Sequence, residues 1–168
     1  MTTYTTERVA LATLKPWPRN YNRHPDRQIA LLKQSLQTFG QVKNIVVYRD
    51  QIVAGHGLAE AARALGWTTI AVHRLPSDWT SAQVEALLVA DNRIAELSDP
   101  DLALLSEIID ATTAADADLA AVMGYNSDDV AQLLRALHVP DAPEEFRSYD
   151  EASIETEHTC PRCNFRWA

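Results

Sequence analysis

Cysteine is almost absent from this chain, since both cysteines, Cys160 and Cys163, lie within the last nine of its 168 residues. The main body therefore has no thiol for nucleophilic, redox or metal-binding chemistry. A gap of only two residues is poor material for a structural disulfide, and it favours a metal knuckle or a reduced pair.

Long apolar runs are also missing. No stretch approaches the roughly 18 apolar residues of a membrane-spanning helix, and the first residues lack the basic start and apolar centre of a signal peptide. With 46% hydrophobic and 23% charged residues, the composition is that of a soluble globular domain with an appendage. We therefore expect a cytoplasmic protein with no membrane partner.

Positive charge is scarce overall but concentrated near the start. The net charge is −8, yet residues 1–60 hold eight Lys and Arg against four acids, while residues 61–168 hold seven against nineteen. This asymmetry allows a basic face that meets phosphates, beside an acidic part that limits non-specific DNA binding. A well-solvated acidic surface is the alternative interpretation.

The hydrophobic spacing predicts a small α+β unit followed by a helical extension. "PDRQIALLKQSLQTFG" indicates a helix, with Pro25 at its first position and Gly40 as its stop. "NIVVYRDQIVAG" indicates two short strands, 44–49 and 51–54, that turn at Asp50. The other expected elements are a helix at 56–65, a strand at 68–75, a helix at 81–97 capped by Asp78 or Thr80, and three helices within 101–137.

Four segments follow from this order. Residues 1–97 form the predicted mixed-sheet core, and residues 98–138 the all-helical extension. Residues 139–157 are acidic, contain proline and lack periodicity, so they are interpreted as a linker. Residues 158–168 form a short tail with the two cysteines.

Gly55-His56-Gly57 stands where a predicted strand gives way to a predicted helix. Unpaired N–H groups at a helix start attract phosphate, and glycine lets a ligand approach the main chain closely. The side chain of His56 would be available to hydrogen-bond a phosphate or to act as acid or base. A tight turn, with His56 as an ordinary helix-start residue, is the alternative.

Asp91-Asn92-Arg93 places an anion, an amide and a cation in adjacent positions near the end of the long predicted helix. An Asp and an Asn can hold Mg²⁺ while an Arg meets phosphate oxygens. Adjacent helical residues point about 100° apart, so all three can face one point only if the helix ends there. A polar last turn, with Arg93 at the negative helix end, is the alternative.

The string "IVAGHGLAEAARALG", followed by "IAVHRL" and "ADNR", resembles the ParB/sulfiredoxin superfamily, and more closely its phage-type ParB-like domains. "SLQTFGQVKNIVV" and "DADLAAVMGYNSDDVAQLL" extend the resemblance over roughly residues 8–137. The resemblance implies a ParB-like core that binds Mg²⁺ with a nucleoside triphosphate, CTP or ATP, and associates with DNA. It implies a phage or mobile-element origin and leaves a homodimer open.

Carried over residue by residue, the resemblance makes Gly55, His56 and Gly57 the phosphate cradle. Asp91 and Asn92 would hold Mg²⁺ and the polyphosphate, while Arg93 and Arg23 neutralise charge. His56 and Asp91 are the candidate catalytic residues. The chain departs from the family at Leu58, where phage-type members keep an Arg, and it has no cysteine in this box, so sulfiredoxin activity is excluded.

Three hypotheses therefore stand side by side. The first is a ParB-like nucleotide-binding, DNA-associated protein. The second is an enzyme of the same superfamily, an NTPase, phosphotransferase or metal-dependent nuclease, with His56 or Asp26 as base. The third is a non-catalytic protein- or DNA-binding module with a degenerate nucleotide pocket, which Leu58 favours.

The tail "HTCPRCNFRWA" has the spacing of half a structural zinc site. Cys160 and Cys163 would supply two thiolates, and zinc needs four ligands. His158 is the candidate third ligand, with His138 or a second chain completing the set. A reduced tail without metal is the alternative.

Overall fold

The computed structural model describes residues 4–137 and 158–167. The chain divides into two compact units, Met1–Leu137 and His138–Ala168, and each is described by itself. None of the helices in these described ranges is long and apolar enough to cross a membrane. The predicted linker at 139–157 lies outside the described residues.

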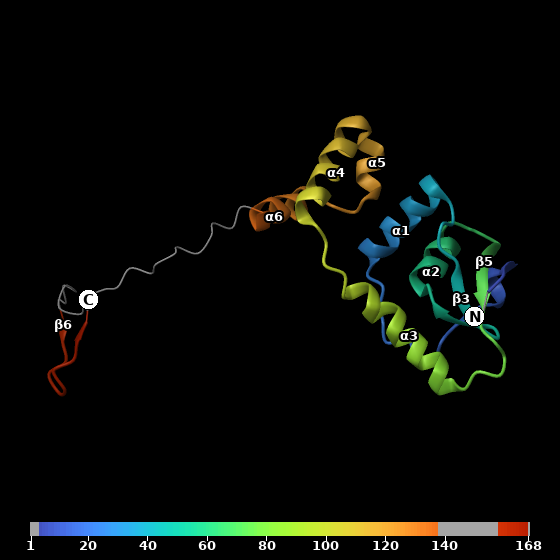
Figure 1. Cartoon of the computed structure of the whole chain (residues 1–168), viewed down its shortest axis with the longest axis horizontal. Helices are drawn as coiled ribbons and strands as arrows, with labels where there is room; N and C mark the ends of the chain where they lie inside the picture. Colours follow the sequence, from blue (N-terminus) through green and yellow to red (C-terminus); the bar gives the residue numbers. More distant parts are fainter. Residues whose placement is uncertain (1–3, 138–157, 168) are drawn as a thin grey trace. The chain divides into compact units, whose positions relative to one another are not determined.

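The first unit is built on a five-stranded mixed sheet with the order β1-β5-β3-β4-β2 (Figure 1). β1 runs antiparallel to β5 and β3 antiparallel to β4, while β3 is parallel to β5 and β2 to β4. Arg49, with φ 57°, turns the chain between β3 and β4. The strands are β1 (Thr6–Ala10), β2 (Lys15–Pro16), β3 (Ile45–Tyr48), β4 (Gln51–Ala54) and β5 (Thr69–Arg74).

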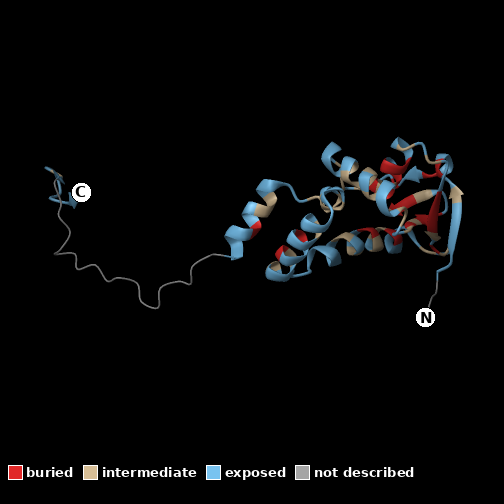
Figure 2. Cartoon of the chain, turned by 90° about the horizontal axis from the view of Figure 1, so that it is seen from above, coloured by how far each residue is buried: buried red, intermediate tan, exposed pale blue. Residues whose placement is uncertain are grey.

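Helices cover both faces of this sheet. Side chains of a strand alternate between the two faces, so a strand can contribute buried residues to both sides. On one face, α1 (Asp26–Phe39) and α2 (His56–Ala64) pack against Ile45, Val47 and Ile52. On the other face, α3 (Ser81–Glu96) packs against Tyr48 and Val53. Figure 2 shows most of the buried residues gathered on the sheet and on the helices that cover it.

α3 begins at a full capping box. The Gln83 N–H donates to Thr80 Oγ1 at 3.3 Å, and the Thr80 N–H donates to Gln83 Oε1 at 2.9 Å. Of the two predicted caps, Thr80 is therefore the one used. The Tyr48 hydroxyl ties the preceding loop to the sheet by donating to the Ser77 and Trp79 carbonyls.

The helical extension, defined here as α4 (Leu102–Ala115), α5 (Ala117–Val122) and α6 (Ser127–Leu137), follows α3. It contacts α1, where the Arg27 guanidinium donates to Asp129 Oδ2 at 2.7 Å and to the Gly124 carbonyl at 3.3 Å. Gly124 has φ 82° and lies so close to Leu31 that an added Cβ would be 3.2 Å from Leu31 Cδ1. The boundary predicted between residues 97 and 98 stays a prediction.

The predicted α+β fold class is confirmed, and the differences are local. β1 and β2 were not expected from the sequence. Pro25 is the N-cap of α1 rather than its first helical residue, while Gly40 ends the helix as expected. The helix expected at 81–97 is α3, which runs through Asp91-Asn92-Arg93 to Glu96, so the helix end that would let these three side chains face one point is not there.

The second unit contains a short hairpin of β6 (His158–Thr159) and β7 (Arg166–Trp167). Both cysteines lie in the turn that joins these strands. The Cys160 N–H donates to the Phe165 carbonyl at 2.7 Å, and the Asn164 N–H donates back to the Cys160 carbonyl at 2.9 Å.

Candidate functional site

The predicted strand-to-helix junction is where β4 meets α2. Gly55 is the N-cap of α2 and has φ 88°, a left-handed conformation that favours glycine. A Cβ at Gly55 would also lie 3.2 Å from Ile45 Cγ1 on β3. Gly55 is thus required by the turn and by packing on the neighbouring strand.

Gly57 makes room for the protein itself. A Cβ at this position would lie 3.0 Å from His24 Nδ1 and 3.0 Å from Leu32 Cδ1 of α1. Because Gly57 has no side chain, the segment before α1 can close over the first turn of α2. His24 is fixed there by a contact of 3.0 Å between its Nδ1 and Gln28 Oε1.

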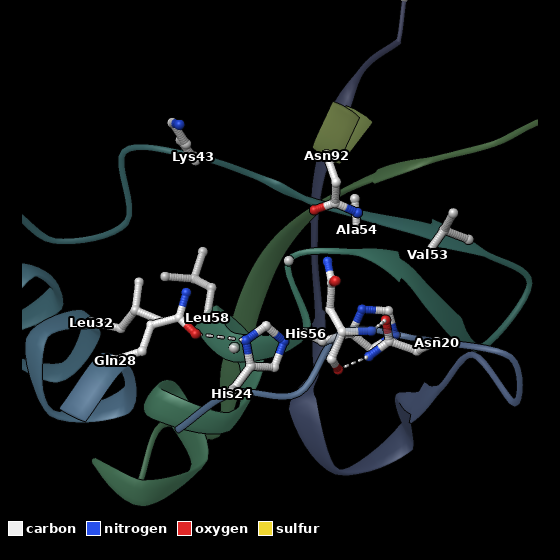
Figure 3. Close-up of a pocket in the computed structure, with 13 residues that line it drawn as sticks. Asn20, His24, Gln28, Leu32, Lys43, Val53, Ala54, His56, Leu58 and Asn92 are labelled. Carbon is white, nitrogen blue, oxygen red and sulfur yellow. Dashed lines mark hydrogen bonds between the residues drawn. The ribbon is translucent and has the colours of Figure 1, made fainter. Parts of the chain in front are cut away.

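His56 is half-buried. Its Nε2 accepts a hydrogen bond from the backbone N–H of Trp17 at 3.3 Å. Burial lowers the pKa of His56, and the nearby His24 lowers the pKa further, while a backbone hydrogen bond with Ile52 opposes both. In Figure 3 the two rings lie near each other under Asn92.

A cavity of about 320 Å³ opens at this junction. Amide and imidazole groups dominate its polar wall, and Lys43 is the only charged side chain among the residues that line it. The helix start supplies the backbone of Gly55, His56 and Gly57. The other lining residues are Asn20, Asn22, His24, Gln28, Leu32, Val53, Ala54, Leu58 and Asn92 (Figure 3).

Asn92 is the member of the Asp91-Asn92-Arg93 triplet that lines this cavity. Its Nδ2 donates to the Leu88 carbonyl at 2.8 Å, which leaves Oδ1 as the acceptor of the side chain. Asp91 lines an adjoining cavity of about 700 Å³, which shares Asn92, Lys43 and Leu58 with the first. Arg93 lines neither cavity and pairs with Glu96 at 3.1 Å. This division is the one expected for residues about 100° apart on a continuing helix.

Arg23 lies on the other side of the two imidazoles. It lines a third cavity of about 430 Å³, together with Glu60 and Arg63. His24 and His56 line both this cavity and the first. The Arg63 guanidinium donates hydrogen bonds to the Leu11 and Leu14 carbonyls. Arg23 takes part in no ion pair among residues 4–137 and 158–167.

The structure therefore brings together part of the predicted site. Gly55, His56, Gly57 and Asn92 share one cavity, Asp91 stands beside it, and Arg23 and Arg93 lie elsewhere. Sequence reasoning missed Lys43 and Gln28, which come from the loop before β3 and from α1. Lys43 lies in the stretch "SLQTFGQVKNIVV" that extends the resemblance, but nothing there marks it as a site residue, and only the fold places Lys43 and Gln28 at the α2 start.

In the second unit, Cys160 is partly exposed and Cys163 exposed. Backbone N–H groups of Arg162 and Cys163 hydrogen-bond to the Cys160 sulfur, and these bonds, with the Cys163 side chain, lower the pKa of the Cys160 thiol. The His158 ring lies against Trp167 in a tilted arrangement, with 5.6 Å between centroids. Across the described ranges 4–137 and 158–167, no three His, Cys, Asp or Glu side chains form a group able to hold a metal ion.

The sequence matches no protein-family model and shows no significant similarity to any curated protein. The structure, however, is similar to that of the C-terminally truncated chromosome-partitioning protein ParB from Caulobacter crescentus, solved in complex with CTP-gamma-S. The TM-score is 0.64 at 19% identity, over 82% of this chain and 81% of that one. The ParB-like fold predicted from the sequence is thereby confirmed.

Two further structures show a weaker likeness. The Pnob8-like ParB-N domain has a TM-score of 0.47 at 21% identity, over 71% of this chain and 53% of that one. The same truncated Caulobacter crescentus ParB, complexed to the centromeric parS site, has a TM-score of 0.45 at 18% identity, over 80% of this chain and 73% of that one.

Proposed function

We propose that this chain is a ParB-like nucleotide-binding protein that works on or near DNA. The observation that carries the proposal is the cavity at the start of α2, where the backbone of Gly55, His56 and Gly57 meets Asn92 from α3. The fold supports it, because the similar Caulobacter crescentus ParB was solved with CTP-gamma-S. Backbone N–H groups at a helix start suit a phosphate.

In this proposal two cations, Lys43 and Arg23, would neutralise the phosphate charge from different cavities. Lys43 lines both the first and the adjoining cavity, is exposed, and takes part in none of the ion pairs among the described residues. Arg23 approaches from the third cavity, whereas Arg93 would first have to leave Glu96. A contact between Arg93 and a phosphate therefore requires the Arg93–Glu96 ion pair to open first.

Asp91 and Asn92 are the residues that would hold a Mg²⁺ ion beside the phosphates. Mg²⁺ prefers oxygen ligands and is commonly held by one or two carboxylates together with waters and substrate phosphates. The Asn92 Oδ1 and the exposed Asp91 carboxylate are oxygen donors on adjoining cavities. When bound, the ion would supply charge neutralisation, while Asn92 keeps its amide nitrogen bonded to its own helix.

DNA association is the second part of the proposal. The positive excess of residues 1–60 supplies cations for phosphate contacts, and the acidic remainder would limit non-specific binding. A cytoplasmic location and a phage or mobile-element origin belong to the same proposal and rest on the sequence features and the resemblance alone. Zn²⁺ held by the Cys160 and Cys163 thiolates completes it.

A second candidate function is a binding module without catalysis. Leu58 stands in the wall shared by the first two cavities and packs against the hydrophobic core, where phage-type members carry an Arg. His56 already accepts the Trp17 N–H through Nε2, so a role as general base would require that bond to break. These two observations favour binding without turnover over a phosphotransferase or nuclease.

Thermal unfolding with CTP, ATP or GTP, with and without Mg²⁺, tests the proposal. A ligand at ~100 times its dissociation constant stabilises by about 2.7 kcal/mol, which raises the melting temperature by several degrees. We expect one nucleotide to give a Mg²⁺-dependent rise that Asp91→Ala abolishes. Asp110→Ala, which removes an exposed acid of α4, is the matched control and should leave the rise intact.

Leu58→Arg sharpens the test, because it restores a cation at the wall of the site. We expect a larger nucleotide-induced rise than in the wild type, measured against the nucleotide-free variant so that any loss of packing cancels. No rise with any nucleotide in either protein would contradict nucleotide binding. Turnover of the bound nucleotide would instead contradict the non-catalytic candidate.

A further inference from the structure

The C-terminal hairpin holds its two cysteines in a tight, hydrogen-bonded turn. His158 pairs with Trp167 and Thr159 with Arg166, and the backbone bonds between Cys160 and both Phe165 and Asn164 close the turn. Asn164 adopts φ 57°, a conformation that Asn tolerates better than most residues. The local backbone, rather than a distant contact, therefore sets the cysteine positions.

The two sulfurs lie side by side and face outward. A side-chain hydrogen bond joins Cys160 and Cys163, and two backbone N–H groups point at the Cys160 sulfur. Cys163 is exposed and Cys160 partly exposed, so a metal ion can reach both. Two adjacent thiolates are half of the tetrahedral set that a structural Zn²⁺ requires.

The described residues of the chain do not supply the other half. No group of three possible metal-ligating side chains occurs within 4–137 and 158–167, and the His158 ring packs against Trp167 in a tilted arrangement. The chain has no further cysteine. A set of four thiolates around one ion thus needs the same turn from a second copy.

We propose that one Zn²⁺ joins two copies of this chain through four thiolates, Cys160 and Cys163 of each copy. The proposal rests on the proposed binding of Zn²⁺ and adds the second chain as its partner. A zinc ion with four thiolates carries a formal charge of −2, and the Arg162 and Arg166 side chains of two hairpins would stand near it. Phe165, which is 67% exposed, and Trp167, which is 43% exposed, provide apolar surface for the copies to cover.

The experiment uses the full chain, purified under reducing conditions without metal and titrated with ZnCl₂. We expect binding to saturate at about 0.5 Zn²⁺ per chain. Light scattering should then give a particle of twice the 18.7 kDa chain mass. A chelator should reverse any zinc-dependent gain in mass, and Cys160→Ser and Cys163→Ser should each abolish stoichiometric binding. Titration with Co²⁺ should give thiolate charge-transfer absorbance corresponding to four thiolates per ion.

His158→Ala and His138→Ala separate this inference from zinc binding within one chain. Both should keep the stoichiometry and the Co²⁺ spectrum of the wild type. Saturation at one Zn²⁺ per chain, or loss of binding in either histidine variant, would overturn the shared site while leaving the proposed zinc knuckle standing. If no Zn²⁺ binds to the reduced chain, both fail.

Discussion

The sheet-based core of the first unit and the helical extension that follows it differ in what holds them together. The eight largest fully buried side chains of the described residues all belong to the core, among them Ile45, Ile52 and Val84. In the extension, only Ser106, Ile109 and Leu133 are buried among the described residues. The core can therefore stabilise itself through hydrophobic burial, whereas the extension depends more on helix caps and on its contact with α1.

The largest expected effect comes from deleting buried atoms in the core. Ile52→Ala removes a fully buried side chain between the sheet and its two helices, and should lower the free energy of unfolding by about 2–5 kcal/mol. Ile109→Ala in α4 should lower the free energy of unfolding by less. The extension buries few side chains, so its helices can move into the space that the substitution leaves. Denaturant unfolding followed by tryptophan fluorescence reports the core, since Trp17 and Trp67 lie there.

The same pair of variants tests whether the core and the extension unfold separately. Circular dichroism follows the helices of the extension as well as those of the core. We expect Ile109→Ala to shift part of the dichroism signal while leaving the fluorescence transition near that of the wild type. Coincident shifts of both signals would mean that core and extension unfold as one unit.

Two glycine substitutions test whether the contact between Gly124 and Leu31 of α1 holds the extension against the core. Gly124→Ala and Gly66→Ala each force alanine to a positive φ, 82° and 77°, at a cost of roughly 1–2 kcal/mol. At Gly66 the added methyl meets open space, whereas at Gly124 it meets Leu31 of α1. Hydrogen exchange should therefore accelerate across the extension in Gly124→Ala only. Identical exchange patterns in the two variants would show that the Leu31 contact does not hold the extension.

Helix ends with a local signal were predictable from the sequence, whereas the edge strand β1 was not. Such a signal is Gly40 after α1. Before α3 the sequence offered Asp78 or Thr80 as the cap, and the structure uses Thr80. β1 was missed because it is an edge strand with mostly exposed side chains, and its partner β5 lies about sixty residues away in the sequence. Pairing at such a distance leaves no local pattern to find.

The candidate site, too, was predictable from the sequence only in part. Gly55-His56-Gly57 was predictable from its place between a strand and a helix. That Gly57 makes room for His24, and that Lys43 reaches the cavity, depend on how α1 and its flanking segments lie over α2. Arg93 points away from the cavity because α3 continues for three residues beyond it, to Glu96, so that residues 91–93 stay helical and face different directions.

A smaller effect is expected from helix caps. Thr80→Ala removes the capping box of α3 and should lower the free energy of core unfolding by about 1 kcal/mol. Asp101→Ala removes the equivalent acceptor of the Leu104 N–H at the start of α4. Its cost should appear as faster hydrogen exchange in the first turn of α4, with the fluorescence transition unchanged. A shift of that transition in Asp101→Ala would contradict the independence of the core.

The smallest expected effect is a dependence on pH at the contact between α6 and α1. The Asn126 N–H, and then the Arg27 guanidinium, hydrogen-bond to Asp129 and hold the pKa of its carboxyl below the usual 3.8. Because the folded-state pKa is lowered, the stabilisation is fully present above pH 3.8 and is lost as the pH falls through the folded pKa. The difference in melting temperature between wild type and Asp129→Asn, followed by circular dichroism, should therefore shrink as the pH falls below about 4. Asp128→Asn changes an exposed acid of the same turn and should show no such trend, so equal behaviour of the two variants would remove Asp129 as the acid-sensitive contact of the extension.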